Sequence, residues 1–222
     1  MLRNRLEVAI EEINNNIIEM GTLVEISIDR AVTGLKTQDI KLAKSVKKYQ
    51  RRVDEMEKSI ESTALQILIT QQPVASDLRL ISVALKIITD MHRIADQARN
   101  IAEISTHLAR SEFVKNPQFI VDMAEKAISM VSRSLDAFLN RDQDLARLVI
   151  ESDDEVDALF VAVRNELIDL IATQPQHGEQ AIDMVMISKY LERIADHAVN
   201  ICEWVIYLAT GSRRIEADED GI

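Results

Sequence analysis

The segment RIADHAVNICE, residues 193–203, occurs in nearly the same form 100 positions earlier, as RIADQARNIAE, residues 93–103. Further upstream the correspondence continues at an offset of 103, where Asp39 matches Asp142 and Asp54 matches Asp157. The change of offset means that the second copy lacks three residues in the turn before its last helix. We therefore interpret the chain as an internal duplication, with repeats at residues 1–113 and 114–211. The acidic tail, residues 212–222, is expected to be disordered.

Apolar residues in both copies of this segment lie alternately three and four positions apart, which is the spacing of a buried helical seam. In the second copy the seam contains Met184, Ile187, Leu191, Ile194, Ala198, Ile201, Val205 and Leu208. Only five Gly and three Pro occur in 222 residues, which disfavours β-sandwiches and barrels. The periodicity predicts six helices, at residues 4–34, 38–71, 77–109, 117–139, 142–173 and 179–210. We expect an all-α fold of two tandem three-helix bundles.

The charge and composition narrow the class of partner. The chain has 26 Lys and Arg against 37 Asp and Glu, a net charge of −11, which argues against nucleic acid or an anionic membrane as the main partner. No apolar run is longer than the one at residues 158–163, which is far below the roughly 20 residues that span a bilayer. Cys202 is the single cysteine, which fits a reducing compartment. We expect a cytoplasmic protein.

No short catalytic signature is present: the sequence has no Gly-rich phosphate loop, GxSxG, HExxH or CxxC motif. None of the four histidines follows a Glu by three residues, so the ExxH element of ferritin-like dimetal proteins is absent. Cys202 is expected to be a small buried hydrophobe rather than a nucleophile. Gly21, inside the first long helix, is expected to allow the close approach of a neighbouring helix.

Paired carboxylates are the strongest candidates for a binding site. Each pair is spaced i,i+4 on one helix face, and the short turn at residues 174–176 makes the two helices antiparallel, so that both pairs lie at one level. This second-half site contains Asp153, Asp157, Glu192 and Asp196, and its oxygen ligands favour hard ions such as Mg, Mn or Fe. The equivalent first-half residues are Gln50, Asp54, His92 and Asp96. Because they carry two carboxylates instead of four, the second site is predicted to bind more strongly.

Three other interpretations stay open. The carboxylates could form an ordinary solvated face that Lys189 or Arg193 neutralises. The protein could be a carboxylate-bridged metalloprotein with redox or metal-storage activity, although the missing ExxH motifs argue against this class. A purely structural coiled-coil scaffold would not explain why polar positions recur together with the apolar ones.

The sequence resembles the PhoU family of phosphate-uptake regulators. The matching segments are EMGTLVE at 19–25, QPVASDLR at 72–79 and YLERIADHAVNI at 190–201, and the resemblance covers nearly the whole chain. It implies two tandem three-helix bundles with surface metal sites built from E(D)xxxD motif pairs, which hold iron, zinc, magnesium or manganese. The corresponding residues are the second-half carboxylates, while Gln50 and His92 depart from the pattern in the first half.

The resemblance also implies a function. Members of this family are not enzymes; they couple the ATPase subunit of the phosphate ABC importer to a phosphate-sensing histidine kinase. They restrain phosphate uptake and the phosphate-starvation genes when phosphate is plentiful, and a homodimer is the expected assembly.

Overall fold

The computed structural model describes residues 2–73, 75–110, 112–113 and 118–211, and no β-strand occurs within these ranges. The first repeat consists of α1 (Leu2–Lys36), α2 (Ile40–Gln71) and α3 (Ser76–Leu108). The second consists of α4 (Gln118–Asn140), α5 (Gln143–Glu151), α6 (Asp153–Thr173), the 3₁₀ helix η1 (Pro175–His177) and α7 (Gly178–Thr210). The predicted all-α fold of two tandem bundles is confirmed. The predicted start of the second repeat and the acidic tail lie outside the described residues.

One predicted helix is interrupted. The fifth, expected to run unbroken over residues 142–173, is divided at Ser152 into α5 and α6. Ser152 keeps a helical backbone, but its hydroxyl donates a hydrogen bond of 2.6 Å to the carbonyl of Val149. Such local bonding by serine competes with the regular helical ladder, because it offers the backbone an alternative partner. The equivalent part of the first repeat is continuous in α2, so the interruption is specific to the second repeat.

The two repeats share a turn geometry as well as a sequence pattern. Asp39 caps α2 by accepting hydrogen bonds from the backbone amides of Lys41 and Leu42, and Asp142 caps α5 by accepting from Leu145. The residue before each cap, Gln38 or Arg141, has a positive φ of 55° or 54°. Each turn is therefore closed by a left-handed residue followed by an aspartate cap.

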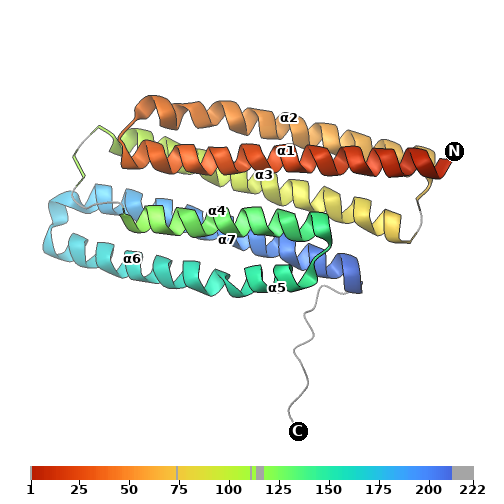
Figure 1. Ribbon diagram of the computed structural model, residues 1–222. Coiled ribbons are helices and arrows are strands. Elements are labelled where there is room, and N and C mark those ends of the chain that lie inside the picture. Colours follow the sequence, from red (N-terminus) through yellow and green to blue (C-terminus); the bar gives the residue numbers. More distant parts are fainter. Residues whose placement is uncertain (1, 74, 111, 114–117, 212–222) are drawn as a thin grey trace, which may run out of the picture.

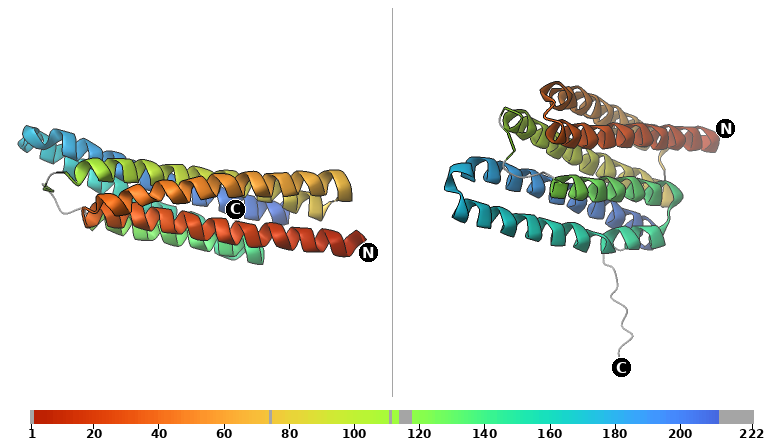
Figure 2. Two further views of the ribbon diagram at one scale, coloured as in Figure 1. Left: turned by 90° about the horizontal axis from the view of Figure 1, so that it is seen from above. Right: turned by 60° about the vertical axis from the view of Figure 1, so that its left-hand side comes forward.

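The helices form a flat array in which the last helix of each repeat lies at the centre. Figure 1 shows α2 along one edge and α5 and α6 along the opposite edge, with α3 and α7 between them, and the right-hand view of Figure 2 shows the same order. The repeats meet where α3 packs against α7 and where α1 packs against α4. Helix α2 contacts only α1 and α3 among the described helices, which leaves its outer face exposed.

The predicted seams line the core. Every predicted seam residue of α7 is buried except Leu208, which is half-buried, and all of the equivalent residues of α3 are buried. Ser105, the one polar member, fits because its hydroxyl donates a hydrogen bond of 2.7 Å to the carbonyl of Ile101. The buried residues of both repeats form one continuous cluster, so the two bundles share a single core.

Polar contacts also join the repeats. The Asp90 Oδ1 atom of α3 lies 2.9 Å from His197 Nδ1 of α7 and accepts a longer hydrogen bond, 3.5 Å, from Asn200. A second pair, His107 of α3 and Asp183 of α7, is also 2.9 Å apart. These contacts fix the register between the two central helices.

Gly21 lies where α1 meets α4 of the other repeat. A Cβ atom at this position would be 2.4 Å from Leu135 Cδ1, which is far inside van der Waals contact. The prediction that Gly21 allows close approach of a neighbouring helix is confirmed, and the neighbour belongs to the second repeat.

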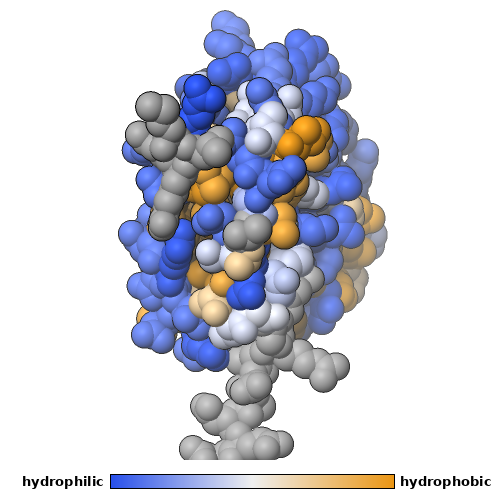
Figure 3. Space-filling view, turned by 90° about the vertical axis from the view of Figure 1, so that its right-hand side faces the viewer, coloured by the Kyte–Doolittle hydropathy of each residue, from blue (hydrophilic) through white to orange (hydrophobic). Residues whose placement is uncertain are grey.

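The surface is mostly hydrophilic. The end of the molecule seen in Figure 3 shows separate hydrophobic side chains within a hydrophilic surrounding. Among the described large apolar side chains the most exposed, Ile69 at 77%, lies in the last turn of α2. None of the described helices combines the length and apolar character that crossing a bilayer requires.

Candidate functional site

The four predicted carboxylates of the second repeat come from two antiparallel helices. Asp153 and Asp157 lie in the first two turns of α6, directly after the interruption at Ser152, whereas Glu192 and Asp196 lie in the middle of α7. The short η1 turn reverses the chain between them. Acidic residues in the first turn of a helix are favoured by the helix dipole, which offsets part of their mutual repulsion.

Asp153 is the most perturbed member of this group. Burial, together with the negative charges of Asp157, Asp196, Asp154 and Glu192 in that order, raises the pKa of its carboxyl from the usual 3.8 to about 6. Its Oδ1 atom is buried and has no hydrogen-bond partner among the described residues. A buried carboxylate oxygen without a partner loses its hydration without compensation, so this atom is poised to accept a proton or a cation.

Glu192 and Asp196 are partly neutralised by one lysine. The Lys189 ammonium forms an ion pair with Glu192 Oε2 on the same face of α7, so this oxygen is not without a partner. The pKa of Asp196 is raised by burial and by Glu192, and Lys189 opposes that rise. Lys189 also lies 5.2 Å from the ring centre of Phe160 on α6, which holds its side chain beside the group.

The four carboxylates offer the oxygen ligands that a hard cation prefers. Their side chains, however, do not surround a common position that a cation could occupy. Within the described ranges, no three or more His, Cys, Asp or Glu side chains are arranged so that they could hold a metal ion. The four carboxylates are therefore neighbours that act on one another electrostatically, as the raised pKa of Asp153 indicates, without converging on one point. All of the donors are oxygens, as Mg and Mn prefer, and a cation between them would remove the repulsion.

The first-half residues are arranged differently. Gln50 Nε2 donates to both carboxylate oxygens of Asp54 at 2.9 Å, and His92 Nε2 lies 2.9 Å from Asp54 Oδ1. The structure thus brings three of the four predicted residues together, but through hydrogen bonds that use the oxygens a metal would need. The fourth, Asp96, lies 3.9 Å from Arg93 and 4.0 Å from Arg99 on its own helix.

Glu57 also belongs to the first-half group, although it was not among the residues predicted from the sequence. Its Oε2 atom lies 3.9 Å from His92 Nε2, and burial raises its pKa while His92 opposes the rise. The available signal was its i,i+3 spacing from Asp54, which places both on one face of α2. The residue equivalent to Glu57 in the second repeat is Phe160, so this position does not carry a carboxylate in both repeats.

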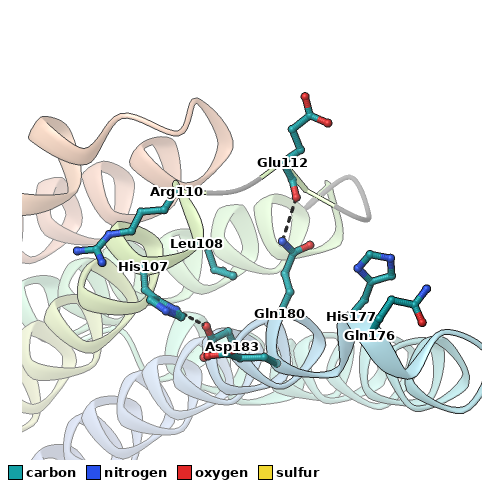
Figure 4. A pocket seen from close by; sticks show the side chains of 9 residues that line it. His107, Leu108, Arg110, Glu112, Gln176, His177, Gln180 and Asp183 are labelled. Atoms are coloured by element: carbon teal, nitrogen blue, oxygen red, sulfur yellow. Dashed lines mark hydrogen bonds and ion pairs between the residues drawn. The ribbon is translucent and has the colours of Figure 1, made fainter.

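A cavity at one end of the two central helices lies away from both groups. It has a volume of about 440 Å³ and is formed where α3 ends and α7 begins. Figure 4 shows His107 paired with Asp183 and the Gln180 side chain reaching the backbone oxygen of Glu112, a hydrogen bond of 3.1 Å. Acidic and basic side chains both line it, and none of the predicted site residues is among them.

Cys202 has no nucleophilic character. It is fully buried, and burial raises the pKa of its thiol to about 12. The expectation of a small buried hydrophobe is confirmed.

Fold and site together define a class: an all-helical protein of two tandem three-helix bundles, with a carboxylate group at the surface of the second. The family model described as the PhoU domain matches residues 17–105 and 120–205, once in each repeat. The chain belongs to the PhoU family.

Individual relatives agree along nearly their whole length. A phosphate-specific transport system accessory protein PhoU homolog from Clostridium acetobutylicum is 35% identical, over 96% of this chain and 98% of the relative. The crystal structure of PhoU from Pseudomonas aeruginosa aligns with a TM-score of 0.89 at 33% identity, covering 93% of this chain and 99% of that one. PhoU from Streptococcus pneumoniae, at 24% identity and a TM-score of 0.86 over 94% and 99%, shares the fold.

Proposed function

We propose that the protein is a non-enzymatic regulator of phosphate uptake and phosphate-starvation signalling. It couples the ATPase subunit of the phosphate ABC importer to a phosphate-sensing histidine kinase in the cytoplasm, and represses the response when phosphate is plentiful. The observation that carries the proposal is the family match in both repeats, with relatives whose name describes an accessory protein of phosphate transport. Exposed charged helix faces on a rigid body suit docking to other proteins.

The regulatory proposal is tested by deleting the gene. A deletion strain without a paralogue should express phosphate-scavenging genes in phosphate-rich medium, and a plasmid copy of this chain should restore repression. Reporter activity in replete medium is the measurement. Normal repression in the deletion strain would refute the proposal.

The partners are tested separately. Affinity capture of the tagged protein from phosphate-replete cells should recover the importer's ATPase subunit and the sensor kinase. A Gly21→Leu variant alters the packing of α1 against α4. If docking needs the intact helical fold, this variant should capture less of the ATPase subunit and less of the sensor kinase. If neither partner is captured from cross-linked cells, the proposed coupling of importer and kinase is refuted.

The carboxylate group of the second repeat is proposed to hold a divalent or trivalent cation such as Mg, Mn, Fe or Zn. Asp153, Asp157, Glu192 and Asp196 would be its ligands, and the unpaired Asp153 Oδ1 supports this assignment. The first-half group is proposed to bind more weakly, because Gln50 and His92 already occupy the Asp54 oxygens and Asp96 faces two arginines.

Calorimetric titration with Mn at neutral pH tests this ranking. Asp196→Ala should weaken binding more than Asp96→Ala, the same substitution at the equivalent position of the first repeat. A greater loss with Asp96→Ala would reverse the ranking, and no binding by the unaltered protein would mean that the carboxylates are a solvated face. Oxygen-dependent turnover by the loaded protein would instead favour a redox metalloprotein.

The assembly is proposed to be a homodimer. Sedimentation velocity at micromolar concentration should give twice the mass of the chain, which is 25.1 kDa. A single species with the mass of the monomer across the concentration range would refute it.

A further inference from the structure

Helix α2 carries a positively charged surface on an otherwise acidic protein. Between Asp39 and Asp54 the helix contains no acidic residue, and its exposed cations recur at spacings that place them on one side. These residues form what we call the basic face: Lys41, Lys44, Lys47, Lys48, Arg51 and Arg52. Arg52 is paired with Glu19 and Glu55, whereas the four lysines have no ion-pair partner in the described part of the chain. The net charge of −11 therefore conceals a local surface of opposite sign.

The internal duplication shows that helix packing does not require this charge. Residues 39–54 contain six basic and two acidic residues, while the equivalent residues 142–157 contain one basic and seven acidic ones. Both segments pack against the other helices of their own repeat. Equivalent helices of the two repeats therefore pack with either positive or negative surface charge. Folding does not explain why the first repeat has cations there.

A cavity opens beside the basic face, between α2 and α3. Its volume is about 270 Å³, and its lining includes Lys44 and Lys47 of α2 and Arg99 of α3. The buried Ala43 and Ala102 also line it, and their small side chains leave the space open. The lining of the cavity is thus mostly apolar, with cations from two helices around it.

Arg99 is held in position at this cavity. Its Nη1 atom donates to Glu103 Oε1 at 3.1 Å, and its Nε atom lies 4.0 Å from Asp96 Oδ1. Glu103 also lines the cavity, but its charge is offset by Arg99. Lys44 and Lys47 therefore contribute positive charge that the described residues do not neutralise.

The equivalent position of the second repeat is more apolar but keeps two charged residues, since Lys44 corresponds to Arg147 and Glu103 to Glu203. Lys47 corresponds to Ile150, Arg99 to Val199, and Thr106, which also lines the cavity, to Ile206. Ile206 is 1% exposed and belongs to the core. At three of the lining positions, therefore, the second repeat has an apolar side chain where the first repeat has a polar one.

We propose that this cavity binds a phosphate-bearing anion, with Lys44, Lys47 and Arg99 holding the phosphate group. A phosphate group matches these three side chains. It carries up to two negative charges and several acceptor oxygens, and a guanidinium beside two ammonium groups supplies the positive charge and the donors. A volume just below the usual range of ligand pockets leaves room for an organic group attached to the phosphate. The ligand is a soluble phosphate monoester or a phospholipid headgroup, and this site is distinct from the carboxylate groups and from the regulatory role proposed above.

Isothermal titration calorimetry with AMP and with inorganic phosphate, at low salt with chelator present, tests the soluble source. Flotation with phosphatidylglycerol vesicles, against phosphatidylcholine vesicles, tests the headgroup source. The variants are Lys47→Gln and Arg99→Gln, and the matched control is Lys58→Gln. Lys58 is also exposed on α2, about three turns from Lys47 on the same side, and carries the same charge.

Lys47→Gln and Arg99→Gln should each weaken binding at least about fivefold, because each removes a charge-assisted hydrogen bond. Lys58→Gln should change binding less than about twofold, and added NaCl should weaken binding by the unaltered protein. Binding of AMP alone or of anionic vesicles alone supports the site and identifies the source of the phosphate. No binding of any probe, or equal losses in Lys47→Gln and Lys58→Gln, would overturn the proposal.

Discussion

The two equivalent groups of polar residues differ in how far their carboxylates have partners. In the first repeat, Gln50 and His92 supply hydrogen bonds to Asp54. In the second repeat, the residues at the positions of Gln50 and His92 are Asp153 and Glu192, so donors are replaced by acceptors. Lys189 compensates in part, and one oxygen of Asp153 has no hydrogen-bond partner among the described residues. The second group therefore retains negative charge that a proton or a cation can relieve.

This charge has a consequence for stability in the absence of metal. Folding raises the pKa of Asp153 from 3.8 to about 6, so the folded protein binds the proton of this carboxyl more tightly than the unfolded chain does. The contribution of this proton to the free energy of unfolding is therefore complete below pH 3.8 and is lost as the pH rises through 6. Asp153→Asn should therefore stabilise the protein at pH 8, by about 1 kcal/mol once solvent screening is allowed for. The gain should disappear near pH 4. Thermal unfolding in chelator at both pH values is the measurement.

The control for this prediction is Asp169→Asn, the same substitution at an exposed position near the other end of α6. It should leave the melting temperature almost unchanged at both pH values. Destabilisation by Asp153→Asn at pH 8 would contradict the explanation that the ionised Asp153 carboxylate is unfavourable in the folded protein.

Among the helices, contacts within a repeat differ from contacts between repeats. Helices α1, α2 and α3 pack through their own apolar faces, whereas α1 also meets α4 at Gly21, where the Leu135 side chain occupies the space that a Cβ atom would fill. A glycine inside a helix costs about 1 kcal/mol relative to alanine, so its presence indicates that close approach of α1 and α4 compensates.

Gly21→Leu should destabilise the protein by about 1–3 kcal/mol, because the new side chain would overlap Leu135 of α4. Chemical denaturation followed by circular dichroism measures the change. The matched control is Gly178→Leu in the first turn of α7, where a Cβ atom would meet nothing within 4 Å. That variant should be neutral or slightly stabilising, and equal effects of the two substitutions would refute the close-approach explanation.

For the whole molecule, two repeats do not mean two independent folding units. The buried residues form one cluster that crosses between the repeats, and the Asp90–His197 and His107–Asp183 pairs join α3 to α7. Separating the repeats would expose the apolar faces along which α3 meets α7 and α1 meets α4, and that exposure is unfavourable in water.

We therefore expect a single cooperative unfolding transition. Differential scanning calorimetry should give a ratio of van 't Hoff to calorimetric enthalpy near one. Gly21→Leu, at the contact between the repeats, should shift this transition as a whole. Two separable transitions, or an unfolding step confined to one repeat, would show that the shared core does not couple them.

The sequence by itself determined the helical class, the duplication and the buried seams. These depend on local periodicity, and a spacing of three and four residues fixes which side of a helix is apolar whatever the neighbouring helix is. It also indicated that Asp153, Asp157, Glu192 and Asp196 would be neighbours, because a short turn between antiparallel helices fixes which residues lie at the same level.

Only the tertiary structure decided the rest. The interruption at Ser152, the pairing of Lys189 with Glu192 and the inclusion of Glu57 depend on which of several nearby partners a side chain reaches. The continuous core and the cavity beside Lys47 depend on how the sides of different helices meet. Such contacts join residues far apart in the chain, and no local spacing encodes the distance between them.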